Sequence, residues 1–251
     1  MEPRETRRDA RPSDAVDTRA AGTPVGRRAF LGRLGLGAVG LVAGSGVQHW
    51  LERTVAPVIA RDPTGLLALL PIGRFRIYTV TGSLPDRARR EYRLAVRGLV
   101  DRELDLSFSD LTAMEPTHLT RDFQCVTGWR VPDVAWTGVR LRDVLERAGV
   151  DDRAAAVRFV SFDGAYSESL TLDQARRDDV LVAYELEREP LSSAHGGPAR
   201  LYVAPMYGYK SCKWLAAIEL TEDVVPGYWE QRGYDGDAGV GRSTGRDVEA
   251  T

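Results

Sequence analysis

Cys125 is the residue with the most distinctive chemistry in this sequence. It lies in the stretch Phe-Gln-Cys-Val-Thr-Gly-Trp at 123–129, and no second Cys or His stands at the spacing of a zinc or redox pair. A thiolate here could be the one soft ligand of a metal whose other ligands come from a cofactor. Two alternatives stay open, a buried inert thiol and a disulfide to Cys212 in an oxidising compartment.

A second group of polar residues follows further along the chain, in His-Gly-Gly-Pro-Ala-Arg at 195–200 and Tyr-Gly-Tyr-Lys-Ser-Cys-Lys-Trp at 207–214. Glycines allow the backbone to approach a bound group, Arg200 offers a planar pair of donors, and Lys210 and Lys213 add point charges around Ser211. These residues could form a phosphate cradle without a P-loop. The alternative is a solvated basic hairpin beside a histidine with a structural role.

Together and in this order, the two groups resemble the molybdopterin-binding domain of the sulfite oxidase family. The likeness covers residues 74–225 and is greatest to small bacterial members such as the catalytic subunit of the periplasmic methionine-sulfoxide reductase. It implies a strand-rich α+β fold and a molybdenum–molybdopterin cofactor, with Cys125 as metal ligand and catalytic residue. It also implies cofactor contacts from seven further residues, namely Tyr78, Thr79, His195, Arg200, Ser211, Cys212 and Lys213.

Departures from the family pattern bear on the substrate. The segment 77–83 lacks the arginine and histidine that animal sulfite oxidases carry after the first strand, so sulfite is not implied. The reductase members have Asn in place of His195 and an Asn-rich start to the first strand, where this chain has Phe75 and Arg76, so methionine sulfoxide is not implied either. The resemblance implies oxygen-atom or two-electron transfer on a small sulfur-containing or related oxo substrate.

Two other functions are compatible with the same residues. One is a Cys-His hydrolase or transpeptidase with Cys125 as nucleophile and His195 as base, which leaves Arg200 and Lys213 without a role. The other is a metal-free binding module of the same fold. Four residues are candidates for the substrate pocket and equally for ordinary core or rim positions: Trp129, Arg130, Asp163 and Tyr166.

The elements that would position these residues are mostly strands. Apolar and polar residues alternate over 74–81 and 92–98, and further strands are expected over 157–162, 180–184, 199–203 and 214–220. Helical spacing predicts short helices over 107–114, 139–148 and 172–177. Because strands outnumber helices and their order is irregular, the predicted class is α+β rather than a doubly wound sheet.

The first 60 residues are expected to lie outside this domain. Residues 1–26 have almost no large apolar side chain and are predicted to be disordered. Arg27 and Arg28 precede an apolar, glycine-rich stretch at 34–47, which is typical of a twin-arginine export signal. We therefore expect export to the periplasm or another extracytoplasmic site, with cleavage near Ala60 or retention of 34–47 as a membrane anchor.

Composition sets the domain organisation and excludes one class of partner. The chain of 251 residues, 28% of them charged, suits one main domain. We assign 61–73 to a linker, 74–226 to the molybdopterin-binding domain and 227–251 to a C-terminal tail. The net charge of −2 gives no global field that would attract nucleic acid. Without room for a haem domain, electrons are expected to pass to or from a separate partner, a membrane haem protein being one candidate.

Overall fold

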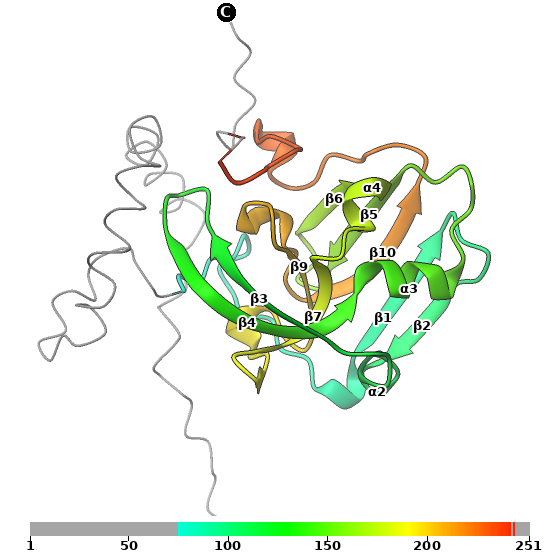
Figure 1. Ribbon diagram of the computed structural model, residues 1–251, viewed down its shortest axis with the longest axis horizontal. Coiled ribbons are helices and arrows are strands. Elements are labelled where there is room, and N and C mark those ends of the chain that lie inside the picture. Colours follow the sequence, from blue (N-terminus) through cyan, green and yellow to red (C-terminus); the bar gives the residue numbers. More distant parts are fainter. Residues whose placement is uncertain (1–74, 242, 244–251) are drawn as a thin grey trace, which may run out of the picture.

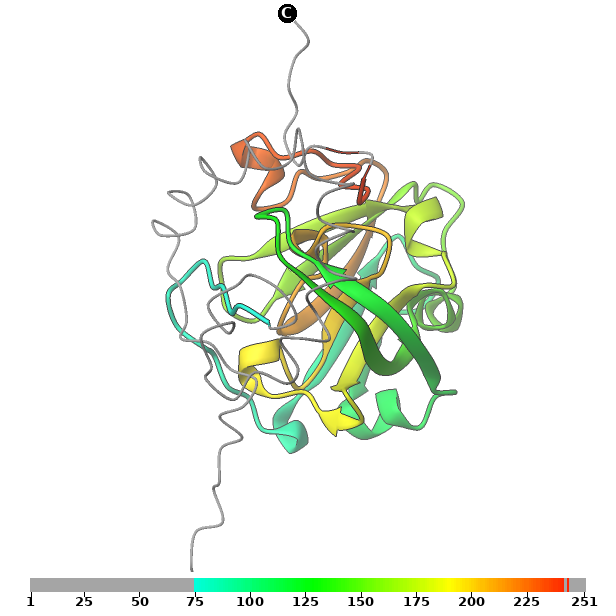
Figure 2. The ribbon, with the colours of Figure 1, turned by 60° about the vertical axis from the view of Figure 1, so that its left-hand side comes forward.

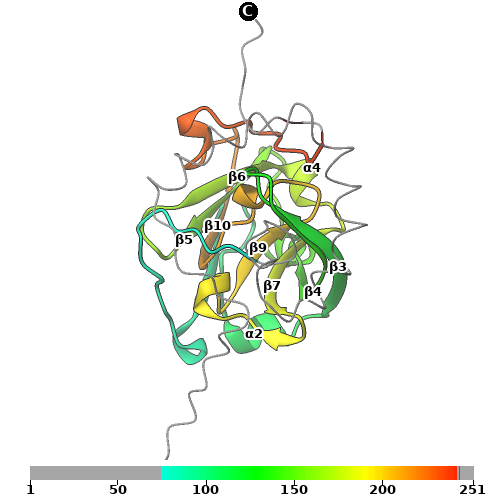
Figure 3. The same ribbon diagram turned by 90° about the vertical axis from the view of Figure 1, so that its left-hand side faces the viewer.

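The computed structural model describes residues 75–241 and 243, and within them it shows the strand-rich α+β fold that the sequence predicts (Figure 1). Two five-stranded sheets share one hydrophobic core. That core contains Leu94 and Ile218 from one sheet and Trp136 and Val182 from the other, all at most 1% exposed. Seen from the side, β5 and β10 lie on the left, β3 and β4 on the right and β9 between them (Figure 3).

The first sheet brings together strands that are distant in sequence. Its order is β2 (Leu104–Ser107), β1 (Arg93–Gly98), β10 (Leu215–Thr221), β5 (Ala156–Ser161) and β6 (Ser167–Thr171). β1 and β10 pair in parallel, and the other neighbours are antiparallel. The strand that follows the lysine-containing stretch at 207–214 thus sits at the centre of this sheet.

The second sheet is antiparallel and contains a long hairpin. Its strands are β3 (Thr117–Gln124), β4 (Arg130–Arg140), β7 (Val180–Leu186) and β8 (Glu189–Pro190), with β9 (Arg200–Val203) also paired to β7. The β3–β4 hairpin runs along the outside of the domain (Figures 1 and 2). Its connecting turn carries Cys125.

The helices are short. They are α2 (Phe108–Thr112), α3 (Leu141–Ala148) and α4 (Leu172–Ala175), with 3-10 turns η2 (Arg89–Glu91), η3 (Ser193–His195), η4 (Gly208–Lys210) and η5 (Glu230–Arg232). Of these, α3 packs against β4 and β7 of the second sheet. In α3 the residues Leu141, Val144, Leu145 and Ala148 recur at helical spacing and are all buried. Gly149, with φ of 72°, ends the helix because this conformation is unfavourable for other residues.

Most of the predicted helices and strands are confirmed, and their first and last residues lie within two positions of the prediction. One predicted strand is wrong. The segment 75–81 is irregular apart from a single bridge at Tyr78. Two of its groups make hydrogen bonds outside a strand ladder. The Tyr78 carbonyl accepts from Lys213 Nζ, and the Thr79 hydroxyl accepts from the Gly82 N–H. The alternation of apolar and polar residues therefore predicted a strand where the chain is irregular.

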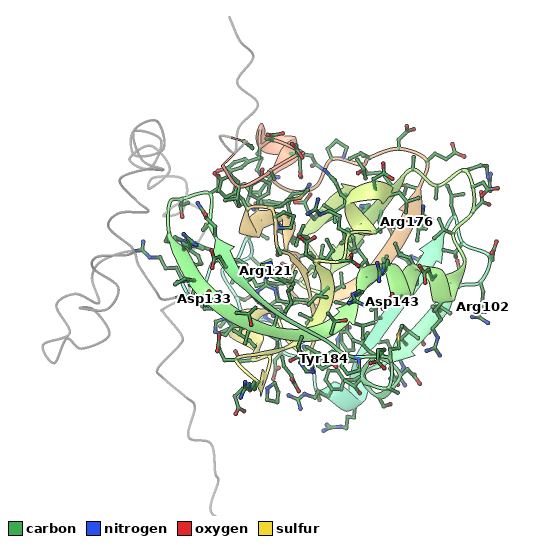
Figure 4. The ribbon with its side chains drawn as sticks, viewed as in Figure 1. Arg102, Arg121, Asp133, Asp143, Arg176 and Tyr184 are labelled. Atoms are coloured by element: carbon green, nitrogen blue, oxygen red, sulfur yellow. The ribbon has the colours of Figure 1, made fainter. Side chains whose placement is uncertain are left out.

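Sequence patterning also missed several strands, above all the β3–β4 hairpin. Only Phe123 is buried in β3, so the strand shows no apolar face. Arg121 and Asp133 on the two strands are exposed, and Figure 4 shows both on this hairpin. Pairing with β4 across 117–124 compensates for the weak pattern.

The end of the described chain packs against the domain. Trp229, Tyr234 and Ala238 are all buried, and the Tyr207 N–H donates to the Ala238 carbonyl. The predicted signal at 1–60 and the linker at 61–73 lie outside the described residues. Among the described residues no helix is long and apolar enough to span a membrane.

Candidate active site

A pocket of about 880 Å³, including the space at its mouth, gathers predicted site residues from four segments of the chain. Seven of the eight line it: Tyr78, Thr79, Cys125, His195, Arg200, Ser211 and Lys213. The eighth, Cys212, does not line the pocket and is fully buried. Asp163 and Tyr166, which the sequence offered as pocket candidates, lie in its wall as well, as does Trp129.

Cys125 sits in a tight turn between β3 and β4. Its N–H donates to the Trp129 carbonyl over 2.9 Å, and its own carbonyl accepts from the Gly128 N–H over 3.0 Å. The Thr127 hydroxyl donates to Sγ at 3.2 Å. Burial raises the pKa of the Cys125 thiol, while the Thr127 hydrogen bond and the Arg76 charge act in the opposite direction. The protein alone thus favours a thiol, and a bound cation would favour the thiolate.

The two cysteines are separate. Both Cys125 and Cys212 are free thiols, so the disulfide alternative is not formed. Among the described residues no group of three or more His, Cys, Asp or Glu side chains could hold a metal ion. A metal on Cys125 would therefore take its remaining ligands from a cofactor or solvent.

Arg200 and Lys213 place two cationic side chains on the pocket, of which Arg200 is buried and Lys213 partly buried. The Arg200 guanidinium is 3% exposed and donates to three backbone carbonyls, those of His195, Leu201 and Ser211. Lys213 Nζ donates to the Tyr78 carbonyl at 2.5 Å and lies 4.3 Å from the centroid of the Trp214 ring. Within the described residues neither cation has a carboxylate in ion-pair contact.

This lack of acidic partners changes the protonation of both groups. Burial lowers the pKa of Arg200 to about 10. Burial and then the Arg200 charge lower the pKa of Lys213 to about 7. Because Arg200 and Lys213 repel each other at this site, its electrostatics improve when an anion binds beside them.

His195 lies beside these cations on the turn η3. Burial, and then the charges of Arg200 and Lys213, lower its pKa to about 4, so the ring is neutral at pH 7. The ring packs edge-on against Phe75, with centroids 4.9 Å apart. The next residue, Gly196, has φ of 93°, and a Cβ there would come within 2.7 Å of the Lys213 side chain. The glycine therefore lets the histidine loop pack directly on Lys213.

The remaining predicted residues contribute hydroxyl groups. Ser211 Oγ accepts from the Val203 N–H at 3.0 Å, and Thr79 Oγ1 accepts from the Gly82 N–H at 2.7 Å. Because each oxygen already accepts a backbone bond, its proton is oriented away from that donor and can be given to a ligand.

Comparisons with known proteins identify this arrangement. Residues 81–229 match the family model described as the oxidoreductase molybdopterin binding domain. This chain belongs to that family. A protein described as the uncharacterized oxidoreductase YuiH of Bacillus subtilis (strain 168) is 40% identical over 155 residues, covering 61% of this chain and 78% of that protein.

More distant relatives share the family domain. Sulfite oxidase from Arabidopsis thaliana is 30% identical over 179 residues, or 58% of this chain and 46% of that protein. The methionine-sulfoxide reductase catalytic subunit of Campylobacter jejuni is 27% identical over 157 residues, or 56% and 52%. The solved structure of the sulfane dehydrogenase SoxCD from Paracoccus pantotrophus has the same fold, with a TM-score of 0.54 at 23% identity over 57% of this chain and 41% of that one. The chain thus spans about half the length of these three relatives.

The residues of the pocket fit the cofactor of the family. Molybdopterin carries an anionic phosphate, and the pocket offers Arg200 and Lys213, neither of which forms an ion pair with a described residue. Gly208 keeps one side of the pocket close-packed, since a Cβ there would meet the Phe123 ring at 2.4 Å. A flat ligand is suited to such a pocket because aromatic rings line it, among them Phe75, Tyr78, Trp129, Trp214 and Trp229.

Sequence reasoning missed part of the pocket wall. Tyr209 and Trp229 line it, and Trp229 lies in the segment that we expected to be a tail. Lys210, grouped with the phosphate cradle in the sequence, instead meets two buried carboxylates. One sequence signal could have drawn attention to this stretch. The chain has only two lysines among its 34 Lys and Arg residues, and they are Lys210 and Lys213.

Proposed function

We propose that this chain is a molybdenum-cofactor oxidoreductase that transfers an oxygen atom or an electron pair on a small sulfur-containing or related oxo substrate. One observation carries the proposal. A buried thiol and two cationic side chains, Arg200 and Lys213, face the same pocket in a member of the molybdopterin-binding family, and among the described residues neither cation forms an ion pair. The two neighbouring cations are unfavourable in an empty pocket, and a metal-bearing anionic cofactor accounts for them and gives the thiol a metal to bind.

We assign Cys125 as the protein ligand of the metal. When bound, the cofactor supplies a molybdenum centre that can exchange an oxygen atom and two electrons with a substrate. Cys125 would bind it through a thiolate, held in place by the turn at 125–129 and by the Thr127 hydroxyl. Catalysis would therefore occur at the end of the pocket that the β3–β4 hairpin provides.

The other predicted residues are assigned to the cofactor's body and phosphate. Arg200 and Lys213 would hold the phosphate by charge-assisted hydrogen bonds, with the neutral His195 ring and the Ser211 hydroxyl as further donors. Tyr78 and Thr79 would contact the cofactor from the irregular segment across the pocket. Because the Cys212 side chain is fully buried away from the pocket, only its backbone could make a contact.

The substrate class is inferred from the pocket and from the relatives. Three relatives are described as acting on sulfur compounds, namely sulfite, methionine sulfoxide and sulfane. The pocket that Cys125 lines also contains Trp129, Tyr166 and Trp229, with Arg76 as a further cation. Such a pocket suits a small substrate with a polar oxo group.

The geometry argues against the hydrolase alternative. A Cys-His nucleophile needs a thiolate beside a protonated imidazole, yet burial raises the pKa of Cys125 and lowers that of His195 to about 4. Among the described residues the Cys125 sulfur bonds to Thr127, and the His195 ring packs on Phe75. A catalytic dyad would also leave Arg200 and Lys213 unexplained.

Metal analysis of the purified full chain tests the proposal. We expect molybdenum and releasable pterin in the wild type. Cys125→Ser should abolish turnover while keeping the fold and the pterin, because a hard hydroxyl replaces a soft ligand and the other contacts persist. Cys212→Ala is the matched control and should keep both metal and turnover. A metal-free, thiol-reactive enzyme would establish the hydrolase, and a protein with neither property would be a binding module.

We further propose export by the twin-arginine route and electron exchange with a separate redox protein, for which a membrane haem protein is a candidate. The support is the pair Arg27 and Arg28 followed by the apolar stretch 34–47. Replacing both arginines with lysine should strand folded, metal-containing protein inside the cell. Normal accumulation of that variant outside the cytoplasm would disprove the twin-arginine assignment.

A further inference from the structure

A second buried charged group lies next to the cofactor residues but has a different composition. Lys210 Nζ is 2.6 Å from Glu168 Oε1 and 2.6 Å from Glu230 Oε1. The exposed fractions of the three side chains are 1%, 0% and 11%. We call Glu168, Lys210 and Glu230 the Glu–Lys–Glu clamp. Most other ion pairs of the described chain are far more exposed, as in Arg153–Asp151 with 66% and 31%.

The charges of the clamp do not balance when all three groups are ionised. Two carboxylates and one ammonium leave one negative charge in a dry site, which is costly. The second oxygens of Glu168 and Glu230 are also buried and make no hydrogen bond with described residues. Ionised carboxylates can only accept, so two of them cannot satisfy each other.

One proton on Glu168 resolves both problems. It makes the clamp neutral and supplies a donor that can reach Glu230. Burial raises the pKa of Glu168 well above its ordinary value; Lys210 opposes that shift and the contact with Glu230 adds to it. The other titratable groups that face the clamp are Tyr166, Tyr209 and Cys212, and burial raises the pKa of each, so they stay neutral at ordinary pH. The Ser169 N–H donates to Glu168 Oε1.

Each member of the clamp belongs to a segment that forms one wall of the pocket. Glu168 lies on β6 two residues after Tyr166, Lys210 follows Tyr209, and Glu230 follows Trp229. Figures 1 and 3 show β6 and the turn at 230–232 at the same end of the molecule. We call Tyr166, Tyr209 and Trp229 the aromatic wall.

Direct contacts join the same segments. The Tyr166 hydroxyl donates to the Tyr209 carbonyl. The Tyr228 N–H donates to the Ser167 carbonyl at 2.8 Å. A Cβ on Gly227 would come within 2.8 Å of the Glu168 backbone, so the C-terminal segment packs tightly on β6. The clamp is the charged part of this junction.

We propose that the Glu–Lys–Glu clamp holds a single proton and positions the aromatic wall of the pocket, and thereby a substrate bound at the site proposed above. The clamp residues do not line the pocket, so they are positioning residues rather than catalytic ones. Through the clamp, the segment at 227–234 becomes part of the active-site structure instead of an appendage.

Infrared spectroscopy tests the proton directly in the full-length protein. The spectrum of the wild type minus that of Glu168→Gln at pH 7 should show the carbonyl band of a protonated carboxyl group. Glu168→Gln should otherwise behave as the wild type, because an amide keeps the shape and the donor of a protonated acid. Absence of the band, or loss of structure in this variant equal to that in Lys210→Met, would overturn the one-proton assignment.

Hydrogen exchange and kinetics test the positioning role. In Lys210→Met, peptides covering 166–171 and 227–234 should exchange faster, while a peptide covering β1 keeps the wild-type rate. KM should rise about tenfold at unchanged molybdenum content, because a displaced wall misplaces the substrate. Wild-type exchange in both peptides, or a wild-type KM in a folded, metal-loaded variant, would refute the role.

Two further arms keep these outcomes interpretable. If Lys210→Met does not fold, Glu230→Gln provides the same comparison, because it leaves the ammonium without a charged partner. The infrared and exchange measurements need no turnover. They therefore decide on the clamp even if the wild type proves to hold no molybdenum, a result that would refute the proposed function alone.

Discussion

The two lysines of this chain are three positions apart, Lys210 buried and Lys213 partly buried, and their surroundings are opposite. Lys210 contacts the carboxyl groups of Glu168 and Glu230, and these outweigh burial so that its pKa is raised. Lys213 has no acid in ion-pair contact among the described residues, and burial and Arg200 lower its pKa to about 7. The comparison separates a completed ionic structure from a site that still needs an anion. A buried cation with acidic partners supports the fold, whereas one without them indicates a ligand.

The largest difference between the two lysines should appear in stability. Lys210→Met leaves two buried carboxyl groups without their cation and should reduce the free energy of unfolding by about 3–5 kcal/mol. Denaturant unfolding measures this. Arg153→Met, which breaks an ion pair at an exposed position, is the control and should leave stability nearly unchanged. Equal losses in the two variants would remove the distinction between buried and exposed pairs.

The second contrast concerns cofactor retention. Arg200→Ala and Lys213→Ala should each weaken cofactor binding by about ten- to a hundredfold, since a charge-assisted hydrogen bond contributes about 1.5–3 kcal/mol. The readout is molybdenum per protein against turnover per bound molybdenum. Arg200→Lys should rescue only in part, because it keeps the charge and loses the planar fork. Full occupancy with reduced turnover per metal would move these residues to the substrate pocket.

The third contrast is a dependence of stability on pH. In cofactor-free protein the pKa of Lys213 falls from 10.5 to about 7, so between these values the folded state binds fewer protons than the unfolded state. The free energy of unfolding should therefore rise with pH across this window and flatten below about pH 7. His195, with its pKa lowered to about 4, adds a similar rise between about pH 4 and 6.5.

Thermal unfolding at a series of pH values measures this dependence. Lys213→Met should abolish the rise above pH 7, and Lys210→Met should keep it. Bound cofactor should flatten it as well, because an anion beside Lys213 keeps the lysine protonated. A slope that survives in Lys213→Met would assign the titration to another group.

The sequence motifs alone were enough to predict many of the residues that line the pocket. Cys125, His195 and Arg200 stand in stretches whose residue types are distinctive, and all three line one pocket. The helix at 141–148 and the strands at 156–161 and 180–186 could be predicted because burial on one face leaves a period in the sequence. These features depend on local pattern, which the sequence contains directly.

Tertiary structure alone decided the remainder. The segment 75–81 has the alternation of a strand, but its carbonyl at Tyr78 bonds to Lys213 from far along the chain. Cys212 lies within the same motif as Ser211 and Lys213, yet it is buried and does not line the pocket. Lys210 looked like part of the phosphate cradle, and only the meeting of β6, η4 and η5 gave it Glu168 and Glu230 as partners. The physical reason is common to these cases. Which charge meets which across the core depends on packing between distant segments, and no local spacing records it.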